Sequence, residues 1–560
     1  MAAGLILAAG LAFAAPALAG EDAGAYLAAG NAFSRNDFPS AAQHFARAML
    51  SDPKNTSLMV NAVISYVGAG DFERALVVAR RLNSADPGNQ IANMLLLSEA
   101  VVRQDFQQAR SYLSNDAPGR DLVSGLARAW IEVGLGRMSK ASASLDSLSG
   151  QSGLKGFALF HKALALALVG DFEGADRILS GKAGTGVPAT RRAVIAHAQI
   201  LSQLERDDAA LALIRQSFSG DLDPALQALV DRLENGDTVP FTLVGNARDG
   251  LGEMFLGLAD ALNKDGASKT TLVYARLAQY LRPDESAAAL LTAGMLEDLG
   301  QFDLATAVYE SIPPDDPAFL SAELGRAGAL RRAGKSEAEI EVLKQLAKSF
   351  PESGLALRAL GDAYRRSGNF EQAAAAYDRA VALLGADRPS QWSLFYRRGI
   401  ANERLGRWTA AEADFRKALE LNPDQPLVLN YLGYSYVEKN TNLEEALSMI
   451  ERAVKNRPDD GYITDSLGWA LYRLGRYRQA VTQMERAVEL VPTDPILNDH
   501  LGDVYWAVGR RREANFQWSR ALSFGPEDKD AKRIRRKLEL GLDKVLQEEG
   551  SPPLSVANDN

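Results

Sequence analysis

One period dominates this sequence: a short turn signal followed by an alanine recurs about every 34 residues. In the last four copies the alanines are Ala411, Ala446, Ala480 and Ala514, so the steps between them are 35, 34 and 34. A fixed period of this length is typical of stacked repeats, in which each copy is one supersecondary unit that buries its apolar face against the next copy. The period therefore predicts a repeat array rather than a single compact core.

The pattern inside one copy indicates two short helices. Gly361 and Ala373 are small residues 12 apart, and each lets one helix approach its partner closely. Gly368 lies between them, where a glycine commonly ends a helix. Phe370 and Tyr377 are large enough to fill the space between the helices. This spacing resembles the tetratricopeptide repeat, a helix–turn–helix of about 34 residues, and the resemblance implies an all-α, right-handed superhelical solenoid.

The same small-residue position can be followed through about nine-tenths of the chain. Twelve of the thirteen steps between these positions differ from 34 by four or less, and the pattern is most regular from residue 355 to 526. The positions are Ala41, Ala75, Ala109, Ala141, Ala175, Ala210, Thr271, Ala305, Glu339, Ala373, Ala411, Ala446, Ala480 and Ala514.

The exceptional step divides the array. It runs from Ala210 to Thr271, a step of 61, and so exceeds one period by most of a further repeat. Within that excess Asp223 to Leu233 has a helical pattern, and residues 234–237 have the composition of a turn. We interpret the segment as an insertion or as a joint between two arrays. The expected organisation is an N-terminal array at 20–220, irregular central repeats at 221–345 and a regular array at 346–526.

The N-terminus resembles an export signal. Residues 4–15 are apolar, and Ala17 and Ala19 supply small residues at the −3 and −1 positions of a cleavage site after Ala19. The alternative is that this run is the first hydrophobic helix of the array. The chain has no cysteine, which suits an oxidising compartment and leaves no residue for a lipid-modified N-terminal cysteine. We therefore expect a signal peptide at 1–19 and a periplasmic protein, with a partner as the route to any association with the outer membrane.

The C-terminus is expected to close the array. Residues 528–546 mix apolar positions such as Ile534 and Leu538 with basic ones such as Arg533 and Lys537. A repeat array needs a terminal cap with a polar outer face, so we assign 527–547 to a capping helix. The alternative is a basic patch for an anionic surface or an acidic partner. The tail at 548–560 is rich in proline and polar residues and is expected to be disordered.

The sequence contains no motif for catalysis or for a cofactor. The four histidines, His44, His161, His197 and His500, lack a second histidine at the spacing of a metal site. Nucleophile elbows and phosphate-binding loops are also missing. The net charge of −9 argues against nucleic acid, which requires a basic excess. We therefore expect a non-enzymatic protein with no cofactor and no metal, whose function lies in its surface.

That surface is expected to be the concave face of the array, which the first helix of each repeat lines. Aromatic residues mixed with Asp, Asn and Arg are the usual composition of a protein-binding hot spot. For Tyr472 the alternative is packing between repeats, and Trp408 and Trp518 are expected in the core. The predicted partner-binding residues are Asn430, Tyr434, Asp465, Trp469, Tyr472, Arg473, Asp499, Asp503 and Trp506, with Val437 and His500 beside them.

The C-terminal copies carry a closer resemblance. Residues 430–434, 442–446, 465–469 and 500–506, together with the central stretch 247–253, look like a family of long bacterial envelope proteins with tetratricopeptide repeats. Some members are outer-membrane lipoproteins that act as partners of carboxyl-terminal processing proteases. The resemblance implies a scaffold or adaptor that binds proteins or peptide segments, and this chain departs from the lipoproteins in lacking the cysteine. The alternative is a binding module for envelope polymers, polysaccharide or peptidoglycan.

Overall fold

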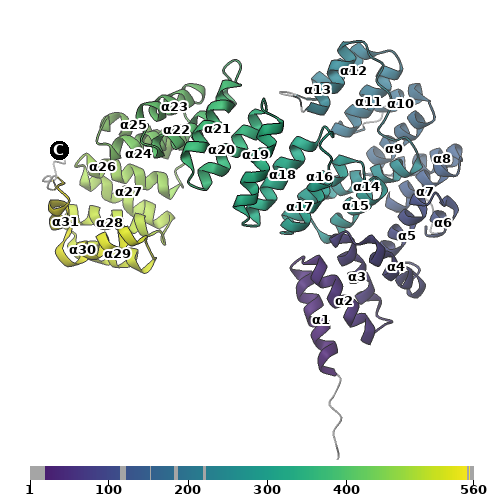
Figure 1. Ribbon diagram of the computed structural model, residues 1–560, viewed down its shortest axis with the longest axis horizontal. Helices are drawn as coiled ribbons and strands as arrows, with labels where there is room; N and C mark the ends of the chain where they lie inside the picture. The colour runs from purple at the N-terminus through teal and green to yellow at the C-terminus, as the bar shows by residue number, and fades with distance from the viewer. Residues whose placement is uncertain are drawn as a thin grey trace, which may run out of the picture. The chain divides into compact units, whose positions relative to one another are not determined.

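The computed structural model describes residues 19–113, 122–151, 153–181, 187–218, 222, 224–551 and 554. Every regular element in these residues is a helix, and no strand occurs among them. The all-α solenoid of helix pairs predicted from the period is therefore confirmed (Figure 1). The predicted signal peptide lies almost wholly outside the described residues, as does most of the predicted disordered tail. None of the described helices combines the length and the hydrophobicity needed to span a membrane.

Contacts between Cα atoms divide the chain into two compact units, Met1–Val342 and Leu343–Asn560. We refer to them as the N-terminal unit and the C-terminal unit. The N-terminal unit contains eighteen described helices and the first half of α19 (Ser336–Ser349). These are α1 Ala19–Ser34, α2 Phe38–Ser51, α3 Thr56–Ala69, α4 Phe72–Ala85, α5 Gln90–Val102, α6 Phe106–Ser111, α7 Leu122–Gly134, α8 Met138–Ser149, α9 Lys155–Leu168, α10 Phe172–Leu179, α11 Arg191–Gln203, α12 Asp207–Ser217, α13 Pro224–Glu234, α14 Ala247–Asn263, α15 Lys269–Leu281, α16 Ser286–Asp298, α17 Phe302–Glu310 and α18 Phe319–Arg332.

The C-terminal unit begins within α19 and is the more regular of the two. A short 3-10 helix, η1 (Pro389–Gln391), precedes its second pair. Its remaining helices are α20 Gly354–Arg366, α21 Phe370–Ala382, α22 Trp392–Arg404, α23 Trp408–Leu421, α24 Pro426–Glu438, α25 Leu443–Asn456, α26 Gly461–Arg473, α27 Tyr477–Leu490, α28 Pro495–Ala507, α29 Arg511–Ser523, α30 Asp528–Leu540 and α31 Leu542–Glu548.

At the turn between α3 and α4, a glycine ends the first helix and an acidic residue caps the second. Gly70 ends α3 with φ +83°, a left-handed conformation that only glycine adopts without strain. The next residue, Asp71, is the N-cap of α4, and its carboxylate accepts a hydrogen bond from the backbone N–H of Arg74 at 3.1 Å. This glycine–acid junction turns the chain sharply between the two helices of a repeat.

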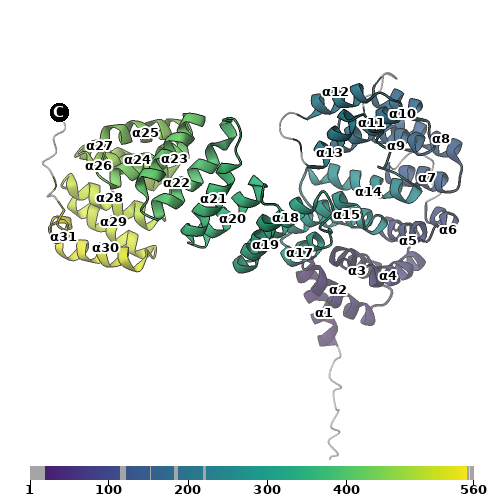
Figure 2. The same cartoon turned by 45° about the horizontal axis from the view of Figure 1, so that its top comes forward.

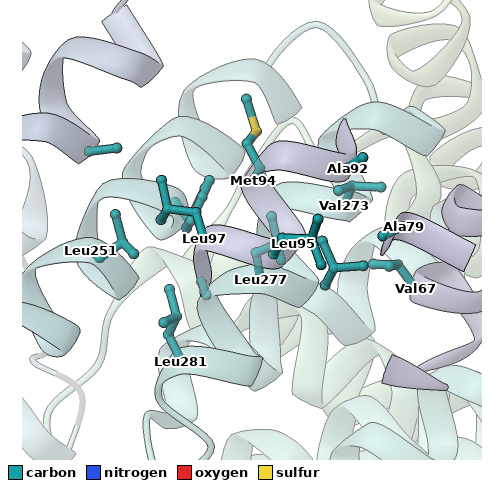
Figure 3. Close-up of a cluster of buried hydrophobic side chains, with 14 of the residues drawn as sticks. Val67, Ala79, Ala92, Met94, Leu95, Leu97, Leu251, Val273, Leu277 and Leu281 are labelled. Carbon is teal, nitrogen blue, oxygen red and sulfur yellow. The ribbon is translucent and has the colours of Figure 1, made fainter. Parts of the chain in front are cut away.

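The N-terminal unit departs from a simple stack, because α14 and α15 return to helices far earlier in the chain. Helix α14 contacts α7 and α9, and α15 contacts α3 and α5. Figure 3 shows the resulting core, in which Leu95 of α5 lies among Val67 of α3 and Leu277 of α15. Arg276 on α15 is buried and donates to the carbonyl oxygen of Gly68 at 3.1 Å. Repeats distant in sequence therefore share one core, a feature that the period does not predict.

The predicted insertion supplies this return. Its helix is α13, close to the predicted bounds of Asp223 and Leu233, and residues 238–246 then lead without helix into α14. Gln199 of α11 ties this segment down, because its side-chain amide exchanges two hydrogen bonds, at 3.0 and 3.1 Å, with Thr242. Figure 2 shows α14 beside α7. The segment in excess of the period thus acts as the joint that brings α14 back to the array.

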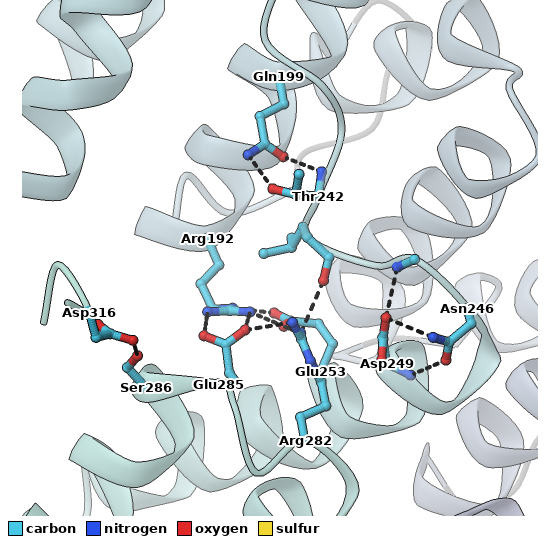
Figure 4. A network of polar contacts seen from close by, with 12 residues as sticks. Arg192, Gln199, Thr242, Asn246, Asp249, Glu253, Arg282, Glu285, Ser286 and Asp316 are labelled. Atoms are coloured by element: carbon cyan, nitrogen blue, oxygen red, sulfur yellow. Dashed lines mark hydrogen bonds and ion pairs between the residues drawn. The ribbon is translucent and has the colours of Figure 1, made fainter. Parts of the chain in front are cut away.

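Ion pairs around the buried carboxylate of Glu253 hold the same joint together (Figure 4). Arg192 of α11 donates from Nε to Glu253 of α14 at 2.6 Å and lies 3.3 Å from Glu285. Arg282 holds Glu285 from the other side at 2.8 Å. Gly250 lies where any Cβ would clash with the ring of Trp130 on α7. The stretch 247–253 therefore combines close packing at Gly250 with a buried carboxylate, Glu253, that anchors the ion pairs.

The predicted C-terminal cap differs from the structure in two respects. The single helix expected at 527–547 is two helices, α30 and α31, separated at Gly541 with φ +80°. Lys537 was expected on the polar side, but its side chain is fully buried against the last repeat. The break lies at Gly541, whose positive φ ends α30, and Ile534 and Leu542 pack into the core of the last repeats, which carries Lys537 onto buried acids of α28.

Candidate binding groove

Four helices of the C-terminal unit form the candidate site: α22, α24, α26 and α28, which we call the inner helices. Each is the first helix of its repeat, and a small residue brings its partner helix close on one side. At Gly433 a Cβ would meet Ile450 of α25 at 2.8 Å, and at Gly468 a Cβ would meet Met484 of α27 at 2.8 Å. Close approach on that side leaves the opposite side of each inner helix to face a common groove.

The groove contains a pocket with a volume of about 660 Å³. All four inner helices, or the turns at their ends, contribute to it, and we call it the groove pocket. Its lining mixes tyrosines with charged and amide side chains, the composition of a protein-binding surface rather than of an apolar ligand cavity. The lining residues are Glu403, Arg404, Asn430, Tyr431, Tyr434, Ser435, Glu438, Lys439, Tyr462, Asp465, Ser466, Asp494, Ile496, Leu497 and His500.

Most acidic groups of the groove pocket accept hydrogen bonds from neutral donors. Glu438 accepts from the Trp469 indole N–H at 2.9 Å, and Arg473 lies 3.9 Å from the same carboxylate. Asp494 caps the first turn of α28 and accepts from the hydroxyl of Tyr462 at 3.3 Å. These contacts neutralise little of the negative charge that the two carboxylates carry.

One buried acceptor in the groove pocket has no partner. The side-chain oxygen of Asn430 is buried and receives no hydrogen bond within the described part of the chain. Nearby, burial together with the charges of Glu438 and Asp465 raises the pKa of Tyr434, so its hydroxyl stays protonated. An unpaired buried acceptor costs free energy until it is satisfied, so Asn430 favours an occupant with an N–H or O–H group.

A stack of three rings borders the groove pocket. Trp469 lies between Tyr472 and His500, with ring centroids 4.8 and 4.2 Å apart and interplanar angles of 14° and 15°. The Nδ1 atom of His500 lies 3.1 and 3.0 Å from the two carboxylate oxygens of Asp465. Burial lowers the pKa of His500, but Asp465, Asp499 and Asp503 together raise it more, so that its pKa is above the ordinary value.

The last repeat is covered by the end of the chain itself. Lys537 of α30 donates to Asp499 at 2.9 and 2.8 Å and to Asp503 at 2.6 and 2.8 Å. Asp503 also accepts from the indole N–H of Trp518 at 2.9 Å. The indole of Trp506 lies against Gly541 and donates to Asp543 of α31 at 3.0 Å. Asp499, Asp503 and Trp506 are thus on the predicted face, but the capping helices occupy it.

The predicted residues consequently separate into three groups. Asn430, Tyr434 and Asp465 line the groove pocket together with His500, and Trp469 and Arg473 border it through Glu438. Tyr472 and Val437 are buried between helices, so the packing alternative describes Tyr472. Trp518 is fully buried as expected, whereas Trp408 is only partly buried, edge-on to Tyr436 and beneath the ammonium of Lys439.

Sequence reasoning missed the ends of the inner helices. Tyr462 lies three residues before Asp465 and is 56% exposed, and Glu438 lies four residues after Tyr434. Both spacings place the missed residue on the same helix face as a predicted one. Extending the predicted face by one turn in each direction would have found them. Among the described residues no three acidic or histidine side chains gather as a metal site.

Comparison with known proteins agrees with the repeat assignment. The tetratricopeptide-repeat family matches residues 324–386, 358–426 and 431–495. A TPR repeat-containing protein of Pseudomonas aeruginosa is 30% identical over 172 residues, which cover 31% of this chain. The match spans only 28% of the length of that relative.

Solved structures are also similar in part. The Cut9–Hcn1 hetero-tetramer of APC/C aligns with 93% of this chain and 96% of its own, at 15% identity and a TM-score of 0.38. A tetratricopeptide repeat protein from Parabacteroides merdae aligns with 45% of this chain and 97% of its own, at 18% identity and a TM-score of 0.37. The matched segments show tetratricopeptide repeats between residues 324 and 495, and the helices on either side of this region form pairs of the same kind.

Proposed function

We propose that this protein is a non-catalytic interaction scaffold of the bacterial cell envelope, and that the groove pocket binds a segment of a partner protein. The observation that carries the proposal is the groove pocket itself: an open volume of about 660 Å³ across the inner helices, with exposed Tyr462 and the unpaired oxygen of Asn430 on its walls. Exposed aromatics beside amides and charges are what peptide-binding surfaces use.

The envelope location rests on the sequence. The apolar run at 4–15 with its small-residue cleavage pattern and the lack of cysteine in the chain both favour export to the periplasm. The resemblance of the C-terminal copies to envelope proteins that assist carboxyl-terminal processing proteases suggests such a protease as the partner. In this proposal the protein holds the protease, or a substrate of it, through the C-terminal unit.

The decisive experiment compares two exposed aromatic residues. The full chain would be immobilised and used to capture proteins from an envelope extract, with Tyr462→Ala as the groove variant and Phe516→Ala as the control. Tyr462 is 56% exposed and lines the groove pocket, and Phe516 is 65% exposed on α29 and does not line it. Both changes should leave folding intact, because neither removes a buried side chain.

We expect Tyr462→Ala to weaken capture by about 2 kcal/mol or more, as a hot-spot residue does, and Phe516→Ala to leave it unchanged. A processing protease among the captured proteins supports the adaptor role, and glycan-assembly proteins instead support the polymer alternative. Equal capture by the two variants would show that the groove pocket is not the binding site.

A further inference from the structure

The charges of the groove pocket favour a basic occupant. Four carboxylates line it, from Glu403, Glu438, Asp465 and Asp494, against two permanent cations, Arg404 and Lys439. Both cations lie over aromatic rings outside the lining, Arg404 over Phe370 at 5.4 Å and Lys439 over Trp408 at 4.7 Å. The acids exceed these two cations by two charges when His500 is neutral, and Arg473 at the border, 3.9 Å from Glu438, offsets one of the two. The remaining negative charge gives the groove pocket a field that attracts positive charge.

The chain contains its own example of a cation bound on this face. Asp465 and Asp499 occupy the same position in successive repeats, one period apart, as do Gly468 and Gly502. Asp499 holds the ammonium of Lys537 at 2.9 and 2.8 Å. A helix that carries a lysine therefore already fits against this position of an inner helix. Asp465 instead lines the groove pocket as a largely buried residue, and His500 is the group that faces its carboxylate.

Aromatic faces beside Asp465 suit a cation as well. Tyr434 and Tyr462 stand on the walls of the groove pocket, whereas Tyr472 and His500 cover the two faces of Trp469. A lysine or arginine head within about 6 Å of such a ring is attracted by its π-electrons. The site thus pairs a carboxylate with aromatic walls.

We propose that the groove pocket recognises a partner segment through a lysine or arginine side chain seated beside Asp465, and that protonated His500 competes with that side chain for the carboxylate. The inference rests on the proposed function, because it names the chemistry of the occupant of the same groove. When His500 is protonated, its imidazolium already forms an ion pair with Asp465. When His500 is neutral, the carboxylate of Asp465 is available to pair with the basic side chain of the partner.

The surroundings set the direction of the pH dependence. The charged and titratable groups near His500 are Asp499 and Asp503 on its own helix, Asp465, Tyr472 and Arg473 on α26, Tyr434 and Glu438 on α24, and Lys537 and Arg533 on α30. Lys537 and Arg533 offset the negative charges of Asp499 and Asp503. Asp465 is therefore the direct partner of the imidazole. Burial opposes protonation of His500, and the three acids overcome it, so its pKa lies above the ordinary value. Binding of a basic segment should therefore strengthen as the pH rises through the titration of His500.

The test uses three labelled octapeptides, acetylated and amidated, in which alanine alternates with lysine, glutamine or glutamate. Their affinity for the full chain would be measured by fluorescence anisotropy across the pH range in which His500 titrates. The histidine titration would be followed independently by NMR of histidine-labelled protein, with His500→Gln to assign the signal. We expect the lysine peptide to bind best and its Kd to fall about tenfold, the effect of one charge at short range, as His500 loses its proton.

Three variants make the interpretation specific. His500→Gln keeps a hydrogen-bond donor for Asp465 but cannot titrate, so it should bind the lysine peptide tightly and independently of pH. Asp465→Asn should weaken binding at least tenfold at high pH. Glu451→Gln removes an exposed carboxylate outside the groove pocket and should change neither value.

The inference is overturned if the glutamate peptide binds as well as the lysine peptide, if Asp465→Asn has no effect, or if affinity does not follow the titration of His500. If no peptide binds while capture from envelope extract still depends on Tyr462, the chemistry proposed for the occupant is wrong and the scaffold function stands. Capture that ignores Tyr462 removes the proposed function instead.

Discussion

Lys537→Met should destabilise the C-terminal unit more than any surface change, because Lys537 neutralises two buried carboxylates. Its side chain is fully buried, and its ammonium makes four contacts between 2.6 and 2.9 Å with Asp499 and Asp503. Methionine retains most of the volume of the lysine stem, so the cavity term is small. The loss is electrostatic: one cation leaves, and two carboxylates remain in a site closed to water.

The size of the effect follows from what else reaches each carboxylate. Asp503 retains the indole N–H of Trp518 at 2.9 Å and Arg533 at 3.6 Å, whereas Arg533 and His500 act on Asp499 through electrostatic attraction without an ion pair among the described contacts. Removing one partner of a buried ion pair costs about 3–5 kcal/mol. We expect that range at pH 8, measured as the change in the free energy of unfolding.

The effect should shrink on acidification. Burial and the neighbouring Asp503 already raise the pKa of Asp499 in the intact protein, and loss of Lys537 raises it further. A carboxyl group whose folded pKa exceeds its unfolded pKa binds more protons in the folded state, so stability rises as the pH falls through the folded pKa. Each unit of pH in that window returns about 1.4 kcal/mol.

The assay is urea unfolding of the full chain followed by tryptophan fluorescence. Five of the six tryptophans lie in the C-terminal unit, since only Trp130 lies outside it, so the signal reports that unit. Lys529→Met, an exposed position on the same helix, is the matched control and should change stability by less than about 0.5 kcal/mol. Adding Asp499→Asn to Lys537→Met should recover a large part of the loss. Equal unfolding of the two lysine variants at pH 8, or no recovery, would refute the reasoning.

Three further predictions concern buried positions. Trp518→Ala should lower the free energy of unfolding by roughly 3–5 kcal/mol, because the ring is fully buried and its N–H donates to Asp503. Comparing its thermal melt with that of Trp518→Phe distinguishes the contribution of the ring from that of the hydrogen bond. Gly250→Ala should destabilise the N-terminal unit by about 1–3 kcal/mol, because the added Cβ clashes with Trp130. Gly257→Ala on the same helix, where the nearest atom to the added Cβ is 3.8 Å away, is the control and should change stability little. Burial lowers the pKa of His161 to about 3, and its Nδ1 accepts a hydrogen bond from the indole N–H of Trp130 at 3.1 Å. Below about pH 6.5 the unfolded state therefore binds a proton that the folded state does not, and the free energy of unfolding should fall from there toward pH 3. His161→Gln should flatten this dependence of stability on pH.

The sequence determined the local architecture because its determinants are local. A small residue in each period predicted the helix pairs, and the structure places these residues where two helices meet, as at Gly468 against Met484. Gly368 predicted a helix end, which its left-handed φ of +77° just after α20 confirms. The segment in excess of the period also predicted α13. Each of these features could be predicted because it depends only on neighbours within one or two repeats.

The binding face was predictable in part for the same reason. Helical spacing placed Asn430, Tyr434 and Asp465 on one face, and all three line the groove pocket. The same spacing placed Asp499 and Asp503 there too, but nothing in a repeat pattern indicates that Lys537, in the segment beyond the last repeat, will cover them. Whether a position on the face is open depends on the element that packs over it.

Only the tertiary structure decided the remaining features. The return of α14 and α15 to α7, α3 and α5 depends on contacts between segments far apart in the chain, such as Trp130 against Gly250 and Arg276 on Gly68. The burial of Lys537 depends on the break at Gly541 and on where the apolar stripe of α30 is seated. A period records how each repeat meets the next, and it carries no information about a helix that meets a repeat far from it in the chain.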